Sequence, residues 1–176
     1  SNWQPIPGGL DHADQLVELA ILSGGLKVGV AAFPDGHPSS NFDLEKDIEV
    51  LLRKEELGAT FATTQFFFDV DKWQQLVERL RKAGSKLPII AGILPITNLK
   101  QLARMVELSG IQIPEQILNR FKDQSEDLNA VRNIGIDIAT EMGKTLIEMN
   151  VPGIHFYTMN TAESTIKIAR NIGLAK

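Results

Sequence analysis

The chain has 176 residues, of which 43% are hydrophobic, with a formal net charge of −4 and no cysteine. This length predicts a single domain over residues 1–176, and the acidic balance argues against a nucleic-acid partner. The absence of cysteine excludes disulfides and thiolate chemistry and fits a cytoplasmic protein, and no apolar run is long enough to suggest a membrane partner. Residues 1–10 are rich in proline and glycine, show no signal-peptide pattern, and predict a loop or a tag remnant.

Periodicity and turn residues divide the chain into alternating strands and helices. Strands are predicted at residues 26–33, 59–67, 87–94 and 151–158, each a largely apolar run. Helices are predicted at 11–22, at about 42–57, from Asp69 or Asp71 to 83, from Asn98 to about 109, at 113–121, at 128–149, and from Asn160, which forms a capping-box pattern with Glu163. This alternation predicts a parallel α/β sheet, either open or part of a barrel, because four strands do not close an eight-stranded barrel.

Polar and aromatic residues gather at the carboxyl ends of the first two strands, where parallel α/β proteins bind ligands. Phe33 and His37 flank the loop AAFPDGHP, where they either stack on and hydrogen-bond a ligand or are a core ring and a loop histidine. Gln65 lies inside the strand ATTQFFFD, and its amide needs partners from a ligand, a water or the backbone. Simple alternation puts Gln65 on the same face as Phe67.

Other candidates depend on helix spacing or on a strand position. Asp47, Val50 and Lys54 share one predicted helix face, which either holds a polar ligand tail or is a solvated side. If that helix begins at residue 41, Lys54 lies about 20 Å from the strand ends. His155 inside the fourth strand is expected to be a satisfied core histidine, and Tyr157 at its end is within reach of a pocket. The three histidines have no metal-ligand spacing, so no metal site is expected.

The motifs GVAAFPDGHP, LLRKEELGA, TQFFFD, PIIAGILPITNLKQ and GIHFYTMN occur in an order and spacing that resemble the 5,10-methylenetetrahydrofolate reductases from Leu26 onward. The resemblance implies a flavoenzyme with a (β/α)₈ TIM barrel, of which this chain is about strands 5–8. It also implies FAD as cofactor, NADH or NADPH as reductant, and reduction of 5,10-methylenetetrahydrofolate to 5-methyltetrahydrofolate in the one-carbon metabolism that supplies methionine.

The resemblance assigns roles residue by residue. It implies FAD binding by Phe33, His37, Ser40, Asp47, Arg53 and Lys54, and folate or nicotinamide binding by Gln65, Gln101 and Met105. No catalytic residue is assigned, because the family's catalytic glutamate and an Arg-Gly-Asp segment lie upstream of the matched region. Three departures stand out: Val50 replaces a polar FAD-contacting residue, Met105 lies where a ring can pack over the nicotinamide or pterin, and Thr161 stands where the family has an arginine for the folate glutamate tail. Loss of that arginine is expected to weaken folate binding.

A half-barrel is expected to be inactive alone and to associate with another chain, because it leaves sheet edges and an inner face uncovered. It is therefore expected to form a homo-oligomer or to pair with the missing half-barrel. Two rival interpretations remain, a non-catalytic self-associating half-barrel and an open-sheet binder of small molecules.

Overall fold

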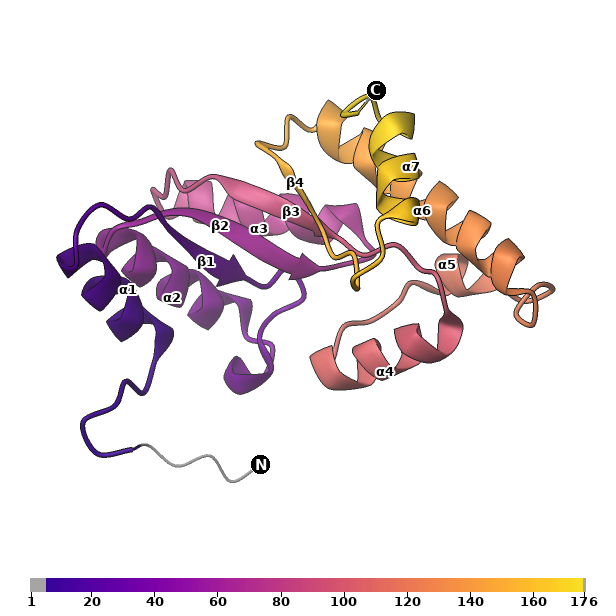
Figure 1. The fold of residues 1–176 in the computed structure, drawn as a ribbon. Coiled ribbons are helices and arrows are strands. Elements are labelled where there is room, and N and C mark those ends of the chain that lie inside the picture. Colours follow the sequence, from indigo (N-terminus) through magenta and orange to yellow (C-terminus); the bar gives the residue numbers. More distant parts are fainter. Residues whose placement is uncertain (1–5, 176) are drawn as a thin grey trace.

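A computed structural model describes residues 6–175 and shows a four-stranded sheet with helices packed along it (Figure 1). The strands are β1 (Val28–Ala32), β2 (Ala59–Phe66), β3 (Ile89–Ile93) and β4 (Ile154–Phe156), and they pair in that order, all parallel. The predicted parallel α/β sheet is therefore confirmed. Residues 1–5 of the predicted N-terminal loop lie outside the described residues.

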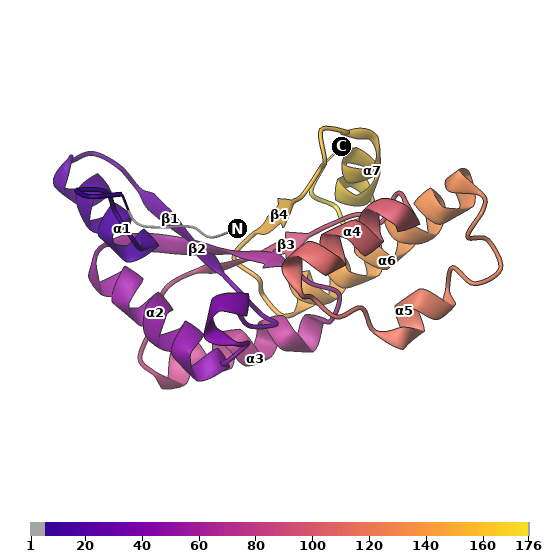
Figure 2. The same cartoon turned by 90° about the horizontal axis from the view of Figure 1, so that it is seen from below.

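Helices cover one face of the sheet. Because parallel crossovers are right-handed and the strand order never reverses, the connecting helices must lie on the same side. They are α1 (Ala13–Leu22), α2 (Leu44–Glu56), α3 (Val70–Lys82), α6 (Leu128–Glu148) and α7 (Glu163–Asn171), and each contacts the next. The short 3₁₀ helix η1 (Pro38–Ser40), α4 (Leu99–Ser109) and α5 (Glu115–Asn119) lie beyond the carboxyl ends of the strands (Figures 1 and 2). This is the arrangement of a TIM-barrel-like fold.

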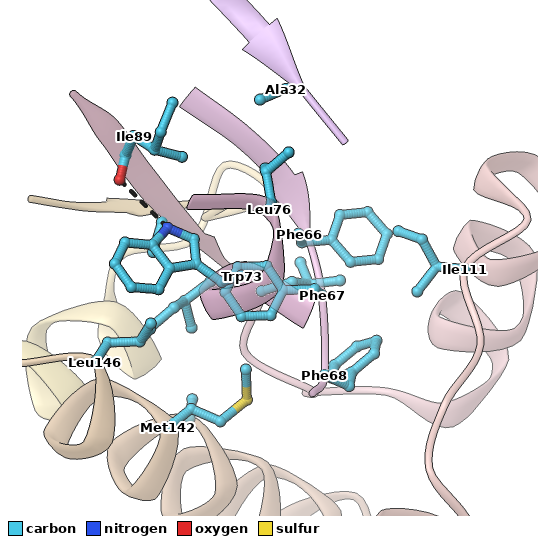
Figure 3. Close-up of a cluster of buried hydrophobic side chains, with 14 of the residues drawn as sticks. Ala32, Phe66, Phe67, Phe68, Trp73, Leu76, Ile89, Ile111, Met142 and Leu146 are labelled. Atoms are coloured by element: carbon cyan, nitrogen blue, oxygen red, sulfur yellow. Dashed lines mark hydrogen bonds between the residues drawn. The ribbon is translucent and has the colours of Figure 1, made fainter. Parts of the chain in front are cut away.

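The hydrophobic core lies between the sheet and the helix layer. Leu76 and Leu146 are buried there beside Trp73, whose indole Nε1 donates a hydrogen bond of 3.3 Å to the Ile89 carbonyl (Figure 3). Burial of each such leucine contributes about 1.5–3 kcal/mol. On the opposite face of the sheet, Gly29, Ala31 and His155 are exposed, so the described helices leave that face open.

A β-bulge breaks the alternation of β2 just before its end. Thr63 pairs with Ile90 and Phe66 pairs with Gly92, so β2 advances three residues while β3 advances two. Phe67 therefore turns to the helix side, where it is fully buried near Trp73, and Phe66 points toward Ile111 (Figure 3). The prediction that Phe67 shares the face of Gln65 is wrong, because strict alternation does not survive a bulge.

Side-chain caps begin several helices where the sequence predicts them. Asp69, and not Asp71, caps α3, since its carboxylate accepts a hydrogen bond of 3.0 Å from the Asp71 amide. Asn98 caps α4 by accepting from the amides of Lys100 and Gln101 at 2.9 and 3.0 Å. Both predicted helix starts are confirmed.

The predicted capping box at Asn160 is wrong. Asn160 has a left-handed backbone with φ of 61°, and α7 begins only after Ala162, which makes no side-chain cap. The chain first closes a turn in which the Thr161 amide and hydroxyl both donate to the Thr158 carbonyl at 3.0 Å. Because this turn occupies residues 158–161, Asn160 cannot take the extended conformation that an N-cap requires.

Candidate functional site

A cavity of about 650 Å³ lies beside α2, between that helix, the start of α1 and the end of β1. Its size falls within the usual range for small-molecule sites. All six residues to which the sequence assigns FAD binding line it, namely Phe33, His37, Ser40, Asp47, Arg53 and Lys54. Val50 lines it as well, so the face shared by Asp47, Val50 and Lys54 borders a cavity and not open solvent.

The ring pair Phe33 and His37 forms one wall of this cavity. The two rings meet edge to face, with centroids 4.4 Å apart. The Ser39 amide donates to His37 Nδ1 at 3.0 Å, so a neutral ring carries its proton on Nε2. The histidine therefore presents an N–H donor on the side of the ring away from its own loop.

Asp47 fixes the loop that carries His37. Its Oδ2 accepts a hydrogen bond of 2.7 Å from the His37 amide, and its side chain is buried. Ser40 closes the same loop, since its hydroxyl donates to the His37 carbonyl at 2.8 Å. Both residues thus hold the wall of the cavity in place, and the Ser40 hydroxyl proton is already engaged.

Lys54 is a buried cation within the cavity lining. It is only 8% exposed, and its ammonium group lies beyond 4.0 Å from any carboxylate of residues 6–175. Burial lowers the pKa of Lys54, while the more distant charges of Asp14 and Asp47 act to raise it. A buried ammonium without a close counter-ion is suited to an anionic ligand.

Arg53 adds a second positive charge in the same last turn of α2. It contacts Glu56 at 3.5 Å, and its side chain is 57% exposed, which makes this a weak surface pair. The sequence predicts that Lys54 lies far along its helix from the strand ends, but this distance does not separate it from the cavity. Helix α2 begins at Leu44 and the cavity follows the helix from Lys46 to Lys54, so a long ligand can contact both ends.

The structure adds lining residues that sequence reasoning missed. Among them are residues from the start of α1 and from α2: His12, Ala13, Asp14, Lys46 and Glu49. The α1 residues precede His37 by more than 20 positions, and only the packing of α1 beside α2 brings them to the cavity. No local motif marks them.

A smaller cavity of about 160 Å³ adjoins the first, because Phe33 and His37 line both. Gln65 lines the smaller cavity, and its Oε1 accepts a hydrogen bond of 3.1 Å from the Phe66 amide. Asp35 lines it too, and burial is the main cause that raises the pKa of its carboxyl group. The two strand ends thus meet at one place, as the sequence predicts.

The α4 residues with a predicted role in folate or nicotinamide binding line neither of these cavities. Gln101 is exposed on the first turn of α4, and Met105 is half-buried one turn later, against the core. The carboxyl end of the same helix reaches the smaller cavity through Leu108 and Ser109. Thr161 lies in the exposed turn before α7.

The expectation of a satisfied core histidine at position 155 is wrong. His155 is exposed, because it lies on the face of the sheet that the described helices leave open. Its ring packs edge-on against Tyr157 at 4.9 Å. Tyr157 reaches across Gly92 and donates to the Thr64 carbonyl at 2.9 Å, so its hydroxyl ties β4 to β2 and lines neither cavity. Burial raises the pKa of Tyr157.

Residues 6–175 contain neither a metal-binding cluster nor a membrane-spanning helix. No group of three or more His, Asp or Glu side chains is placed to hold a metal ion. None of the helices in this part of the chain is both long enough and apolar enough to cross a membrane.

Comparison with known proteins gives a consistent result. The family model described as methylenetetrahydrofolate reductase matches residues 1–173. Methylenetetrahydrofolate reductase 2 of Saccharomyces cerevisiae is 33% identical over 98% of this chain and 30% of the yeast protein. The 5,10-methylenetetrahydrofolate reductase of Escherichia coli is 34% identical over 93% of this chain and 55% of that protein. The chain therefore spans about half the length of this bacterial relative.

A solved structure shares the fold. It is an uncharacterized protein from Clostridium thermocellum that binds two copies of 5-methyl-5,6,7,8-tetrahydrofolic acid, with a TM-score of 0.55 and 21% identity over 85% of this chain and 53% of that one. The family match over nearly the whole sequence, together with the relatives of about one-third identity, leads to one conclusion. The chain belongs to the methylenetetrahydrofolate reductase family.

Proposed function

We propose that this chain is the FAD-binding half, about strands 5–8, of a (β/α)₈ reductase that converts 5,10-methylenetetrahydrofolate to 5-methyltetrahydrofolate with NADH or NADPH. One observation carries the proposal beyond family membership. The six residues assigned to FAD from the sequence, which extend from Phe33 to Lys54, line a single cavity of about 650 Å³. They come from the end of β1, the loop after it and α2, so one strand–loop–helix unit supplies all six positions.

The lining chemistry fits a long, anionic cofactor with an aromatic end. Lys54 and Arg53 offer positive charge to the pyrophosphate. Among the described residues, no carboxylate forms an ion pair with the Lys54 ammonium. At the other end of the cavity, the Phe33 ring packs against a flat ligand and His37 Nε2–H donates to it. FAD, when bound, supplies the hydride chemistry, and the protein's part is to hold and orient it.

The substrate side is proposed at the smaller cavity and along α4. Gln65 donates its free amide N–H to the folate ring or to the nicotinamide, since its oxygen is engaged with the Phe66 amide. Gln101 and Met105 contribute from α4. The folate-binding protein of Clostridium thermocellum, which shares the fold, makes a folate ligand reasonable here.

The remaining strands of the barrel are proposed to cover the open face of the sheet. Gly29, Ala31 and His155 are exposed on that face, as expected of a sheet that meets further strands. We propose that residues 1–176 form one half-barrel domain and that it does not catalyse folate reduction alone. A second copy of the chain is the alternative partner for that face.

Flavin titration and a two-part kinetic assay test the function. The protein is expected to quench FAD fluorescence, and the full-length protein is expected to show flavin absorbance and both NAD(P)H–menadione and folate-dependent turnover. Arg53→Ala together with Lys54→Met should lower FAD affinity, whereas Lys82→Met, at an exposed position that lines neither cavity, should not. A full-length protein that neither purifies with flavin nor binds added FAD would refute the proposal.

A further inference from the structure

Phe42 has a backbone conformation that bulky residues seldom adopt. Its φ is 61° and that of Asn41 is 57°, both in the left-handed region. Asparagine tolerates this region because of its short polar side chain, but phenylalanine does not. A strained aromatic residue persists only where surrounding contacts stabilise it, and such residues cluster at functional sites.

The strained residue closes the loop that carries the His37 wall of the large cavity. The Phe42 amide donates to the His37 carbonyl at 3.0 Å, and the Phe42 backbone lies directly on Gly36. A Cβ atom on Gly36 would be 2.7 Å from Phe42 Cα, so only glycine permits this closure. The position of Phe42 is therefore fixed by the same loop that positions His37.

The Phe42 ring extends away from this loop to the carboxyl end of α4. It rests on Gly110, the C-cap residue of α4, where an added Cβ would be 2.7 Å from Phe42 Cζ. The ring is 45% exposed, so it bridges two surface elements and is not a core residue. Figures 1 and 2 show the loop after β1 and α4 side by side beyond the strand ends.

Helix α4 has few buried anchors besides this contact, because Leu99, Met105 and Val106 are only partly buried where they pack against the core. Leu102 is its only fully buried residue. Its last turn nevertheless contributes Leu108 and Ser109 to the smaller cavity, which Gln65 also lines. Any change in order at the carboxyl end of α4 therefore alters the proposed substrate side.

We propose that Phe42 is a positioning residue that couples occupancy of the FAD cavity to the order of α4. The inference rests on the proposed function. A ligand that contacts His37 fixes the loop, the loop fixes the Phe42 ring, and the ring holds Gly110 and the last turn of α4 beside Gln65. Bound FAD thus orders the site of the second ligand, although FAD itself does not contact α4.

Amide hydrogen exchange with and without FAD tests this coupling in the full-length protein that contains the chain. Phe42→Asn removes the ring and keeps a residue that favours the left-handed turn, whereas Phe42→Tyr keeps the ring. Leu118→Ala, at a position of similar exposure (46%) on α5, is the matched control. FAD is expected to slow exchange of residues 106–111 by about fivefold in the wild type, Phe42→Tyr and Leu118→Ala, and by less than about twofold in Phe42→Asn.

Exchange at residues 37–54 distinguishes the possible failures. FAD should slow exchange there in all four proteins, which shows that the cofactor still binds. If Phe42→Asn keeps the full effect at 106–111, or if the wild type shows slowing at 37–54 alone, the coupling is refuted and the proposed function stands. If FAD changes neither segment in the wild type, both proposals fail.

Discussion

Replacement of Lys54 by methionine should have opposite effects on stability and on cofactor binding. Lys54 is 8% exposed, and burial lowers its pKa, so the folded protein holds this charge at a cost. Methionine has a similar length and no charge. The ligand-free variant is therefore expected to be as stable as the wild type or more stable by about 1 kcal/mol. FAD loses a charge-assisted contact worth about 1.5–3 kcal/mol, which corresponds to about 10- to 150-fold weaker binding.

Urea denaturation of the ligand-free protein and fluorescence titration with FAD measure the two effects. Lys82→Met at the exposed end of α3 is the control and should change neither. The pH dependence gives a third readout. Between the lowered pKa of Lys54 and its ordinary value of 10.5, the unfolded chain binds more protons than the folded one, so stability rises with pH. The Lys54→Met variant should lose this rise.

One combination of results would refute this reasoning. If Lys54→Met destabilises the ligand-free protein and binds FAD as tightly as the wild type, Lys54 supports the fold through contacts that the charge does not explain. The cavity would then not hold the cofactor phosphates at that end.

Three further predictions concern other parts of the molecule. Gln65→Ala should lower folate-dependent NAD(P)H oxidation about 10- to 100-fold in the full enzyme and leave bound-flavin absorbance unchanged, since a lost hydrogen bond costs about 1–3 kcal/mol; a variant that loses FAD but keeps folate binding would contradict this. Gly135→Ala should destabilise by about 3 kcal/mol in urea, because its Cβ would lie 1.7 Å from the Ile96 carbonyl oxygen. Gly143→Ala, on the same helix, should cost clearly less, because the atoms nearest its Cβ would be side-chain carbons of Ile172, at 3.1 and 3.2 Å, and not backbone atoms, and equal effects of the two exchanges would disprove the packing argument. Asp35→Asn should raise urea stability at about pH 7.5 but not at about pH 4, because burial raises the pKa of Asp35 above 3.8 and stability falls as that proton is lost; an equal gain at both pH values would point to another cause.

The sequence predicts features that depend on a few neighbouring residues. The caps at Asp69 and Asn98 follow from side chains that bond their own helix starts, and the structure shows both bonds. The four strands follow from apolar runs between turn residues, and each is found within its predicted range. The sequence also predicts that the carboxyl ends of β1 and β2 share a site, because neighbouring parallel strands end at the same edge of a sheet. Phe33 and Gln65 do line one cavity.

Features that depend on distant residues could not be predicted. The bulge before Phe66 follows from how β2 meets β3, where the Gly92 amide turns to the Thr64 hydroxyl at 2.8 Å. His12 joins the large cavity only through helix packing. The capping-box pattern at Asn160 fails because a tight turn occupies the same residues, and a sequence pattern does not reveal which local structure is preferred.

The order of strands in the sheet bears on how the protein is made. Each strand pairs with the one synthesised just before it, from β1 through β4. From β1 to β3, each strand meets its partner after a single connecting helix. This order lets β1 and β2 associate on the ribosome while β3 is still being translated. The long segment between β3 and β4 is the exception, and closure of that loop is expected to be the slowest step in assembly of the sheet.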